Sequence, residues 1–304
     1  MIPALILASI LIFSFMHIAP GDPAALILGE SATPVQVEQL KEVMGLNKPL
    51  HIQYMIWITN ILKGDFGTSF FYSKPVLQVL ASHAEASILI GVFTIMLIII
   101  FGISIGFISA VKYNSLVDQT AMGLAMLGAS IPTFWSGLIC MLIFSVHLRW
   151  LPSSGFPSVI ASGNFSNLRY LLLPCLVLAI PNSALIIRIT RASMLDILKE
   201  DYVRTARAKG LSVLKVNIRH VFRNALIPIT SVLGFTFLNI VSSTVVTESV
   251  FAIPGIGRLV VQSLLRRDYT VIQGVIIIIT FLYMTINLLV DILYAYLDPR
   301  IRYN

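Results

Sequence analysis

Residues 188–228 read RITRASMLDILKEDYVRTARAKGLSVLKVNIRHVFRNALIP. This stretch is strongly basic, whereas the runs 170–187 and 225–246 beside it are apolar and carry no formal charge. The pattern predicts a basic segment between two membrane-spanning helices. The stretch holds nine of the chain's 21 Lys and Arg residues: Arg188, Arg191, Lys199, Arg204, Arg207, Lys209, Lys215, Arg219 and Arg223.

The stretch also has helical periodicity. Glu200 lies four residues before Arg204, which is the favourable order for an ion pair along a helix. Four further residues recur at i, i+3, i+7 and i+11, on one face of a helix: Leu195, Leu198, Tyr202 and Ala206.

A glycine and a proline are expected to delimit two helices in this stretch. Gly210 favours a left-handed C-terminal stop, with Lys209 in the last turn of the first helix. Ser212 can cap a second helix, which is predicted to run to Asn224 and to end before Pro228. A helix, a tight turn and a second helix at a membrane surface are therefore predicted.

The stretch resembles the cytoplasmic coupling loop of the membrane-spanning subunits of bacterial ATP-binding-cassette importers. That loop has Glu-Ala-Ala, three residues, Gly and a later Ile-x-Leu-Pro. Arg204 stands at the Glu, Thr205 and Ala206 at the two Ala, and Gly210 at the Gly, while Pro228 lies five residues later than in the general pattern. The form DYVRTARAKGLS followed by RHVFRNALIP is similar to the dipeptide and oligopeptide permease branch.

In that family the loop docks into a groove on a separate ATPase subunit. A basic segment that contacts anionic lipid head groups is the alternative interpretation. The resemblance implies that these residues contact the ATPase: Asp201, Tyr202, Arg204, Thr205, Ala206, Ala208, Gly210 and Leu211.

The composition indicates an integral membrane protein. Hydrophobic residues make up 57% of the chain and charged residues only 12%, against roughly 25% charged in a soluble domain. The net charge of +7 is concentrated in one segment between spans, so membrane orientation explains it better than nucleic-acid binding does. Cys140 and Cys175 lie in apolar runs and predict buried thiols rather than a disulfide or a metal site.

No catalytic, metal or nucleotide motif is found in the sequence. The five histidines are scattered without metal-ligand spacing, and the phosphate-binding pattern GxxxxGK[ST] is missing. An ATP-driven transporter would therefore bind ATP and Mg²⁺ on another subunit, and we expect neither an enzyme nor a bound cofactor in this chain.

Six apolar runs can each cross a bilayer core of about 30 Å. Because lipid cannot satisfy unpaired backbone groups, all are predicted to be helices, in an all-α integral membrane fold. One transmembrane domain covers 1–304: a first helix at 1–19, a folded extracytoplasmic segment at 20–86, and a five-helix core at 87–304 that includes the loop 188–225. The runs are 2–18, 88–111, 120–146, 170–187, 225–246 and 271–290.

The segment 20–86 is too polar to span a membrane but has helix signals. Thr33 and Gln36 form a capping box, with Pro34 at the first helical position and Gly45 as the stop. A second helix is expected over 51–62, ending near Gly64. The family resemblance continues here with GDP at 21–23 and GDFG at 64–67; the family usually has a short basic arm before the first helix, which favours a start site upstream.

The distribution of Lys and Arg predicts the orientation. With both termini and the loop in the cytoplasm, the inner segments hold twelve of these residues and the short outer loops hold five. The Lys residues of the 67-residue segment 20–86 are left out of this comparison, because loops longer than about 60 residues cross the membrane largely regardless of their charge. The basic loop and both termini are therefore expected on the cytoplasmic side of a bacterial inner membrane.

The fifth run carries a polar stripe on an apolar helix: Thr236, Asn239, Ser243 and Thr247. The stripe predicts either one wall of a hydrated pathway or hydrogen bonds to neighbouring helices.

In the last run, Asn287 and Asp291 lie one turn apart. A carboxylate at this depth needs a partner, and Arg188 or Arg191 at the same height are expected to pair with Asp291.

Two further features involve turns and bends. Residues 248–258, ESVFAIPGIGR, resemble the family's ETVFxxPGxGRL, so either a short re-entrant element or a plain outer turn is expected. Pro132 and Pro181 lie inside spans and should bend them.

The resemblance extends from GDP at 21–23 to DPRIRY at 298–303 and implies the permease subunit of a binding-protein-dependent importer of dipeptides or oligopeptides. It implies as partners a second homologous permease, most simply in a heterodimer, two ATPase subunits and a periplasmic solute-binding protein. Relatives in this branch carry nickel or glutathione. A self-sufficient secondary transporter or channel, and a receptor or assembly subunit, are the alternatives from other classes.

Overall fold

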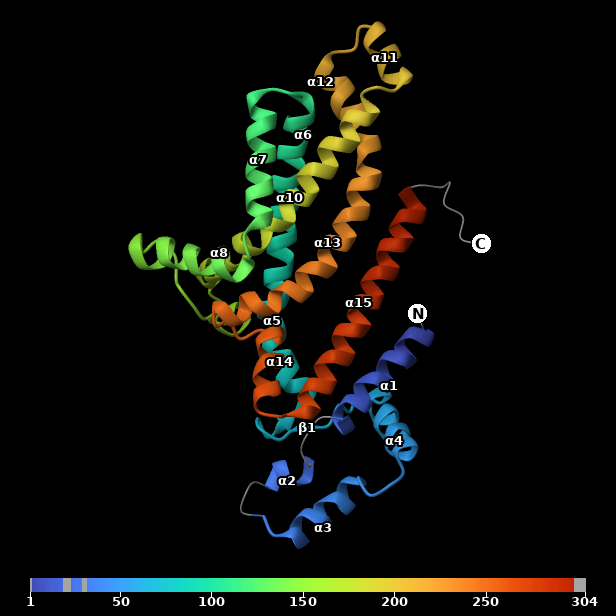
Figure 1. Ribbon diagram of the computed structural model, residues 1–304, viewed down its shortest axis with the longest axis vertical. Helices are drawn as coiled ribbons and strands as arrows, with labels where there is room; N and C mark the ends of the chain where they lie inside the picture. The colour runs from blue at the N-terminus through green and yellow to red at the C-terminus, as the bar shows by residue number, and fades with distance from the viewer. Residues whose placement is uncertain (1, 19–22, 29–31, 298–304) are drawn as a thin grey trace. The chain divides into compact units, whose positions relative to one another are not determined.

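The computed structural model describes residues 2–18, 23–28 and 32–297, whose regular structure is helical apart from one short β-ladder (Figure 1). The chain divides into two compact units. The first is drawn from Met1–Ala84 and Leu259–Thr285, and the second from Glu85–Arg258 and Ile286–Asn304. Helices α5, α14 and α15 contribute residues to both units.

The first unit contains the N-terminal helix, the helices that follow it, and the ladder. Its elements are α1 (Ile2–Ile18), α2 (Pro23–Leu28), α3 (Pro34–Met44), α4 (Leu50–Leu62), β1 (Thr68–Ser69), β2 (Lys74–Pro75), the start of α5 (Val76–Leu97), most of α14 (Ile256–Leu265) and the first part of α15 (Tyr269–Leu297).

Local signals explain α3. The Oγ1 of Thr33 accepts from the Gln36 N–H at 3.4 Å, and the Gln36 side chain accepts from the Thr33 N–H at 2.9 Å, which satisfies donors at the helix start. Gly45 ends the helix with φ +71°, a conformation that favours glycine. The capping box and the glycine stop predicted from the sequence are confirmed, as is a second helix over nearly the expected range.

A buried carboxylate fastens the ladder to the start of α15. The Asp268 side chain accepts from the Ser69 hydroxyl at 2.5 Å and from the Phe71 N–H at 3.4 Å, and it also accepts from the Val271 N–H at 3.3 Å. The Arg266 guanidinium lies 3.5 Å from the centre of the Phe71 ring. The predicted all-α class is thus correct except for this two-residue antiparallel ladder.

The second unit contains the long apolar helices and the basic loop. Its elements are the rest of α5, a π-helical segment η1 (Ile98–Ile103), α6 (Ser104–Val111), α7 (Leu116–Ser130), α8 (Thr133–Cys140), a π-helical segment η2 (Met141–His147), α9 (Val159–Ser162), a 3₁₀ segment η3 (Phe165–Leu171), α10 (Leu172–Ile197), α11 (Asp201–Ala208), α12 (Val213–Val216), a π-helical segment η4 (Asn217–Phe222), α13 (Arg223–Val250), the first residues of α14 and the end of α15.

Within the described residues, four continuous helices are long and apolar enough to cross a membrane: Val76–Val111, Phe165–Ile197, Val213–Val250 and Tyr269–Val290. The pair Leu116–Ser130 and Thr133–His147 would make a fifth span, but it is bent by 102°. The apolar helix at the N-terminus is shorter than these. The membrane class is therefore supported, while the count of six spans stays a prediction.

Pro132 explains the bend between α7 and α8. It has no backbone N–H to donate and disfavours helical geometry at the residue before it. Ile131 accordingly adopts an extended conformation, with φ −85° and ψ 126°. The bend expected at Pro132 is confirmed, whereas α10 continues as one helix through Pro181.

Helix α10 is the centre of the second unit and packs against η1, α6, α7, α8 and α13. Two glycines four residues apart allow this close approach. A Cβ at Gly102 would lie 2.9 Å from Ile186, and a Cβ at Gly106 would lie 2.6 Å from the Cβ of Thr190. Small residues at this spacing let membrane helices pack backbone against side chain.

Candidate functional site

The basic loop forms two helical segments around a glycine turn. Helix α11 covers Asp201–Ala208, and Gly210 follows with φ +78°. Figure 1 shows α11 and α12 beyond the ends of α10 and α13. The predicted stop at Gly210 is confirmed.

The predicted end of the second helix before Pro228 is wrong. The helix that starts at Val213 runs through η4 into α13 without a break, so Pro228 lies inside it. Proline removes one backbone hydrogen bond, but ending the helix here would leave several backbone groups unpaired in apolar surroundings. One helix therefore connects the loop to the far end of the span.

The predicted stripe is divided between two helices. Helix α10 ends at Ile197, and Glu200 has extended geometry with φ −67° and ψ 144° before α11 begins. This break rotates α11, so Val203 rather than Tyr202 turns inward and Tyr202 is exposed.

The inward face of α11 is packed against the ends of the two long helices. Val203 and Ala206 are buried in one cluster with Met194 of α10 and Ala225 of α13, and Leu211 is partly buried beside it. Of the eight residues expected to contact an ATPase, Ala206 and Leu211 therefore contribute to the packing of the loop. The other six are exposed: Asp201, Tyr202, Arg204, Thr205, Ala208 and Gly210.

Tyr202 fastens the outer face of α11 to the next helix. Its hydroxyl donates to the His220 carbonyl at 3.2 Å and accepts from the Asn224 amide at 2.7 Å. The Asn224 amide also donates to the His220 carbonyl, at 3.1 Å. No sequence rule would have found these contacts, because the partners lie 18 and 22 residues from Tyr202.

The ion pair within α11 is fully exposed to solvent. Arg204 lies 3.5 Å from Asp201, and this pair replaces the expected pair with Glu200, because Glu200 lies outside the helix. Exposed pairs of this kind contribute at most about 1 kcal/mol. The basic side chains of α11 thus keep most of their charge available to a partner.

A buried ion pair lies in the same unit. Arg191 donates to Asp118 from Nε at 2.6 Å and from Nη2 at 2.8 Å, and the Asn114 N–H donates to the same carboxylate at 2.9 Å. The Arg191 guanidinium also lies 5.3 Å from the centre of the Tyr113 ring. This contact fastens the turn before α7 to α10.

The ion pair gives Arg191 a partner that was not predicted from the sequence. Arg191 binds Asp118, in the first turn of α7, and the expected pairing of Asp291 stays a prediction. Arg188 is exposed, and the side chain of Asp291 lies outside the described residues. Sequence reasoning missed Asp118, although an aspartate three residues after the helix-capping Ser115 was a usable signal.

The polar stripe on α13 is not one exposed face. Thr236 and Thr247 are buried, and their hydroxyls donate to carbonyls of their own helix, those of Val232 and Ser243. Asn239 is exposed and Ser243 is half-buried.

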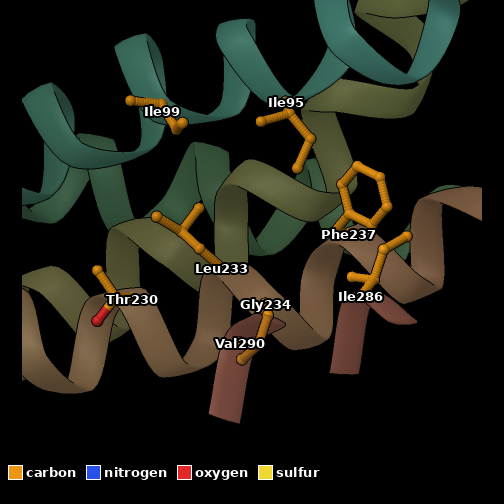
Figure 2. Close-up of a pocket in the computed structure, with 8 residues that line it drawn as sticks. All are labelled: Ile95, Ile99, Thr230, Leu233, Gly234, Phe237, Ile286 and Val290. Atoms are coloured by element: carbon orange, nitrogen blue, oxygen red, sulfur yellow. The ribbon is translucent and has the colours of Figure 1, made fainter. Parts of the chain in front are cut away.

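A different face of α13 lines a cavity of about 330 Å³ in the second unit. Figure 2 shows Ile95 and Ile99 on one side of this cavity, opposite Leu233 and Phe237 of α13. The lining is apolar except for Thr230, and the remaining lining residues are Gly234, Ile286 and Val290. Among the described residues, no group of three or more His, Cys, Asp or Glu side chains could hold a metal ion.

Residues 102–303 match the family described as "Binding-protein-dependent transport system inner membrane component", and residues 1–90 match the N-terminal component of such systems. The chain belongs to this family. The family resemblance found in the loop sequence is confirmed. As an inner membrane component of a transport system, this permease is a transport subunit and not an enzyme.

Individual relatives are similar in sequence to the permease over its full length. It is 43% identical over 302 residues to a probable peptide ABC transporter permease of Sinorhizobium fredii, covering 99% of this chain and 96% of that relative. It is 40% identical over 303 residues to a glutathione transport system permease of Salmonella choleraesuis, covering 100% and 96%.

A solved structure of the MetNI methionine ABC transporter, in an inward-facing conformation, has the same fold over much of the chain. Its TM-score is 0.60 at 16% identity, and the likeness covers 73% of the permease and 97% of that chain. At this identity the likeness concerns the fold alone.

Proposed function

We propose that this permease is one of two membrane-spanning subunits of an ATP-driven, binding-protein-dependent importer of short peptides. In this proposal the loop 188–225 lies in the cytoplasm and docks on a separate ATPase subunit, which binds ATP and Mg²⁺.

The observation that carries the proposal is the division of α11 into two faces. Val203 and Ala206 are packed into the cluster at the ends of α10 and α13, whereas Asp201 and Arg204 are exposed. A partner that moves the exposed face must also move the two long helices, because packed cores shift as rigid bodies. An unpacked basic loop would bind a partner without transmitting its motion.

The full assembly follows from the family and the charge distribution. Six spans, with both termini and the loop in the cytoplasm, put 20–86 in the periplasm, and twelve Lys and Arg against five favour this orientation. The pathway would form between this subunit and a second homologous permease. Two ATPase subunits would bind the loops, and a periplasmic solute-binding protein would deliver the substrate.

Residues on α13 are candidates for contact with the substrate. Asn239 is exposed and Ser243 half-buried, so these two members of the polar stripe are available to a pathway shared with the second permease. Thr236 and Thr247 donate to carbonyls of α13 itself, so in this proposal they stabilise the conformation of this helix. Asn239→Leu should reduce uptake without reducing ATPase association, and unchanged uptake would remove Asn239 from the pathway.

A short peptide is the proposed substrate because of the full-length likeness to a peptide permease. Glutathione is the second candidate, favoured by a relative of nearly equal identity. Glutathione is itself a tripeptide, so the two candidates share amide and carboxylate groups. Uptake of labelled dialanine and labelled glutathione into proteoliposomes of the whole complex would distinguish them.

Charge reversal on α11 tests the docking proposal. Arg204→Glu with Arg207→Glu should abolish co-purification of the ATPase subunits, because both side chains lie on the exposed face and leave the packed face intact. Lys215→Glu is the control, since Lys215 is also exposed but lies on α12. Undiminished co-purification by the double variant would contradict docking through α11, and a wild-type permease without ATPase partners would favour a self-sufficient transporter.

A further inference from the structure

A glutamate at the end of α13 is completely buried. Glu248 lies in the last turn of the helix, and its Oε1 accepts from the Ser87 hydroxyl of α5 at 2.5 Å. Its Oε2 accepts from the Arg258 N–H at 2.9 Å. The Ser87 oxygen in turn accepts from the Ile256 N–H at 2.8 Å. One carboxylate therefore joins α13, α5 and the residues that begin α14.

The hairpin Phe251–Arg258, which follows α13, is shaped around this carboxylate. A Cβ at Gly255 would collide with the Glu248 carboxylate, and a Cβ at Gly257 would lie 2.6 Å from the Cα of Val245. The Ile253 N–H donates to the Glu248 carbonyl at 2.9 Å. The glycines in PGIG are thus explained by the close approach of backbone to a buried carboxylate, rather than by the turn alone.

The same hairpin is fixed by apolar packing. Phe251 and Ile253 are buried in a cluster with Ile90 of α5 and Leu173 of α10. This cluster would hold the hairpin near α5 without Glu248, but apolar contacts are not directional. The hydrogen bonds of Glu248 and Ser87 are what fix the backbone of residues 256–258 against the two helices.

The position of Glu248 matters because α13 is continuous with the loop. The helical run Val213–Val250 contains 38 residues and begins beside Gly210. At 1.5 Å per residue it is about 57 Å long. A displacement of the loop therefore reaches the far end of α13 as the motion of one helix, and Glu248 connects this end to α5 and the hairpin through hydrogen bonds.

We propose that Glu248 is a positioning residue for transport, which makes the outer end of α13, the hairpin Phe251–Arg258 and α5 move as one body. This inference rests on the proposed function, because it assumes that the loop is moved by an ATPase. Without the carboxylate, α13 would still move with the loop, but the hairpin and α5 would follow it loosely. ATP hydrolysis would then continue with little transport.

A neighbouring glutamate provides a matched control. Glu85 lies two residues from Ser87 on α5 and is also an acceptor for backbone N–H groups, those of Val159 and Ile160, and for the Ser158 hydroxyl. It fastens a different segment and makes no contact with the hairpin in these hydrogen bonds. Glu248→Gln and Glu85→Gln are the same chemical change in two carboxylates that accept backbone N–H groups, one buried and one partly buried.

The first measurement is amide hydrogen exchange of the purified complex in nanodiscs. Hydrogen bonds to a buried carboxyl group limit local opening, so Glu248→Gln should raise exchange of residues 252–259 by about tenfold or more and leave 157–162 unchanged. Glu85→Gln should have the reverse pattern. Ser87→Ala removes only the bridging hydroxyl and should raise exchange of the Ile256 amide, so it tests the same contact if Glu248→Gln does not assemble.

The second measurement is uptake per ATP hydrolysed by the complex in proteoliposomes, with labelled dialanine as the probe and labelled glutathione in parallel. Glu248→Gln and Ser87→Ala should lower this ratio, about tenfold for Glu248→Gln, whereas Glu85→Gln should leave it unchanged. A changed exchange pattern with an unchanged ratio would overturn the positioning role. Unchanged exchange at 252–259 would show that Glu248 does not fix the backbone of the hairpin. If the wild-type complex took up neither probe, the proposed peptide importer would be rejected, and with it the role of Glu248 in transport. The exchange measurement would still show whether Glu248 fixes the hairpin.

Discussion

Replacing Asp118 by Asn should destabilise the permease, because this carboxylate holds Arg191 in place between the turn before α7 and α10. Two charge-assisted hydrogen bonds of 2.6 and 2.8 Å would be weakened, and the Asp118 side chain is only 3% exposed. Removing one partner of a buried pair costs about 3–5 kcal/mol. The Arg191 side chain is 24% exposed, so water can solvate part of the freed charge. We therefore expect a loss of about 2 kcal/mol in the free energy of unfolding.

The assay is the free energy of unfolding, measured by denaturant titration in mixed micelles. Arg191→Met should cost at least as much, because it leaves the buried carboxylate with only neutral donors. The double variant should cost less than the sum of the two single variants. Arg188→Met is the control, since Arg188 is exposed one turn earlier on α10, and its effect should stay within about 0.5 kcal/mol. Additive single effects, or a loss for Asp118→Asn no larger than that of the control, would refute the reasoning.

Three further predictions concern packing, capping and the loop. Gly106→Ala should destabilise the protein by about 1–3 kcal/mol, because the new Cβ meets Thr190. A Cβ at Gly123 would have nothing within 4 Å, so Gly123→Ala should be neutral or stabilising in the same titration, and an equal loss in both variants would contradict the packing argument. Thr33→Ala should cost about 1 kcal/mol locally, seen as faster amide exchange in α3, and unchanged exchange would argue against the capping box. Tyr202→Phe removes the hydrogen bonds to η4 and α13 and should weaken ATPase association several-fold while insertion is unchanged; wild-type affinity would show that this contact does not position α11.

Local features of the fold were predictable from the sequence because their causes lie within a few residues. The capping box of Thr33 and Gln36 and the glycine stops at Gly45 and Gly210 all appear where the sequence places them. The bend at Pro132 belongs to the same class, because proline acts on its own backbone and on the residue before it.

The same local rules failed where the surroundings decided the outcome. Pro228 was expected to end a helix, but the apolar surroundings favour a continuous one. Tyr202 was expected to share one helix face with Leu195, Leu198 and Ala206, but the extended conformation of Glu200 interrupts the helix and changes the phase of α11. Periodicity alone does not reveal such an interruption.

The polar contacts of the site were out of reach because their partners are distant in the chain. Asp118 and Arg191 are 73 residues apart, and Ser87 and Glu248 are 161 residues apart. The sequence drew attention to Arg191 and to the turn after Glu248, but it held no information on which groups would meet them. Only the packing of the helices supplies that information.

The most direct test of the account is the accessibility of the exposed face of α11 in the assembled transporter. A single cysteine at Thr205, with Cys140 and Cys175 replaced by alanine, would be treated with a membrane-impermeant maleimide in vesicles of known orientation. Labelling is expected in inside-out vesicles only, and the cysteine should be protected when the ATPase subunits are bound. Labelling in right-side-out vesicles, or equal labelling with and without the ATPase, would contradict this expectation.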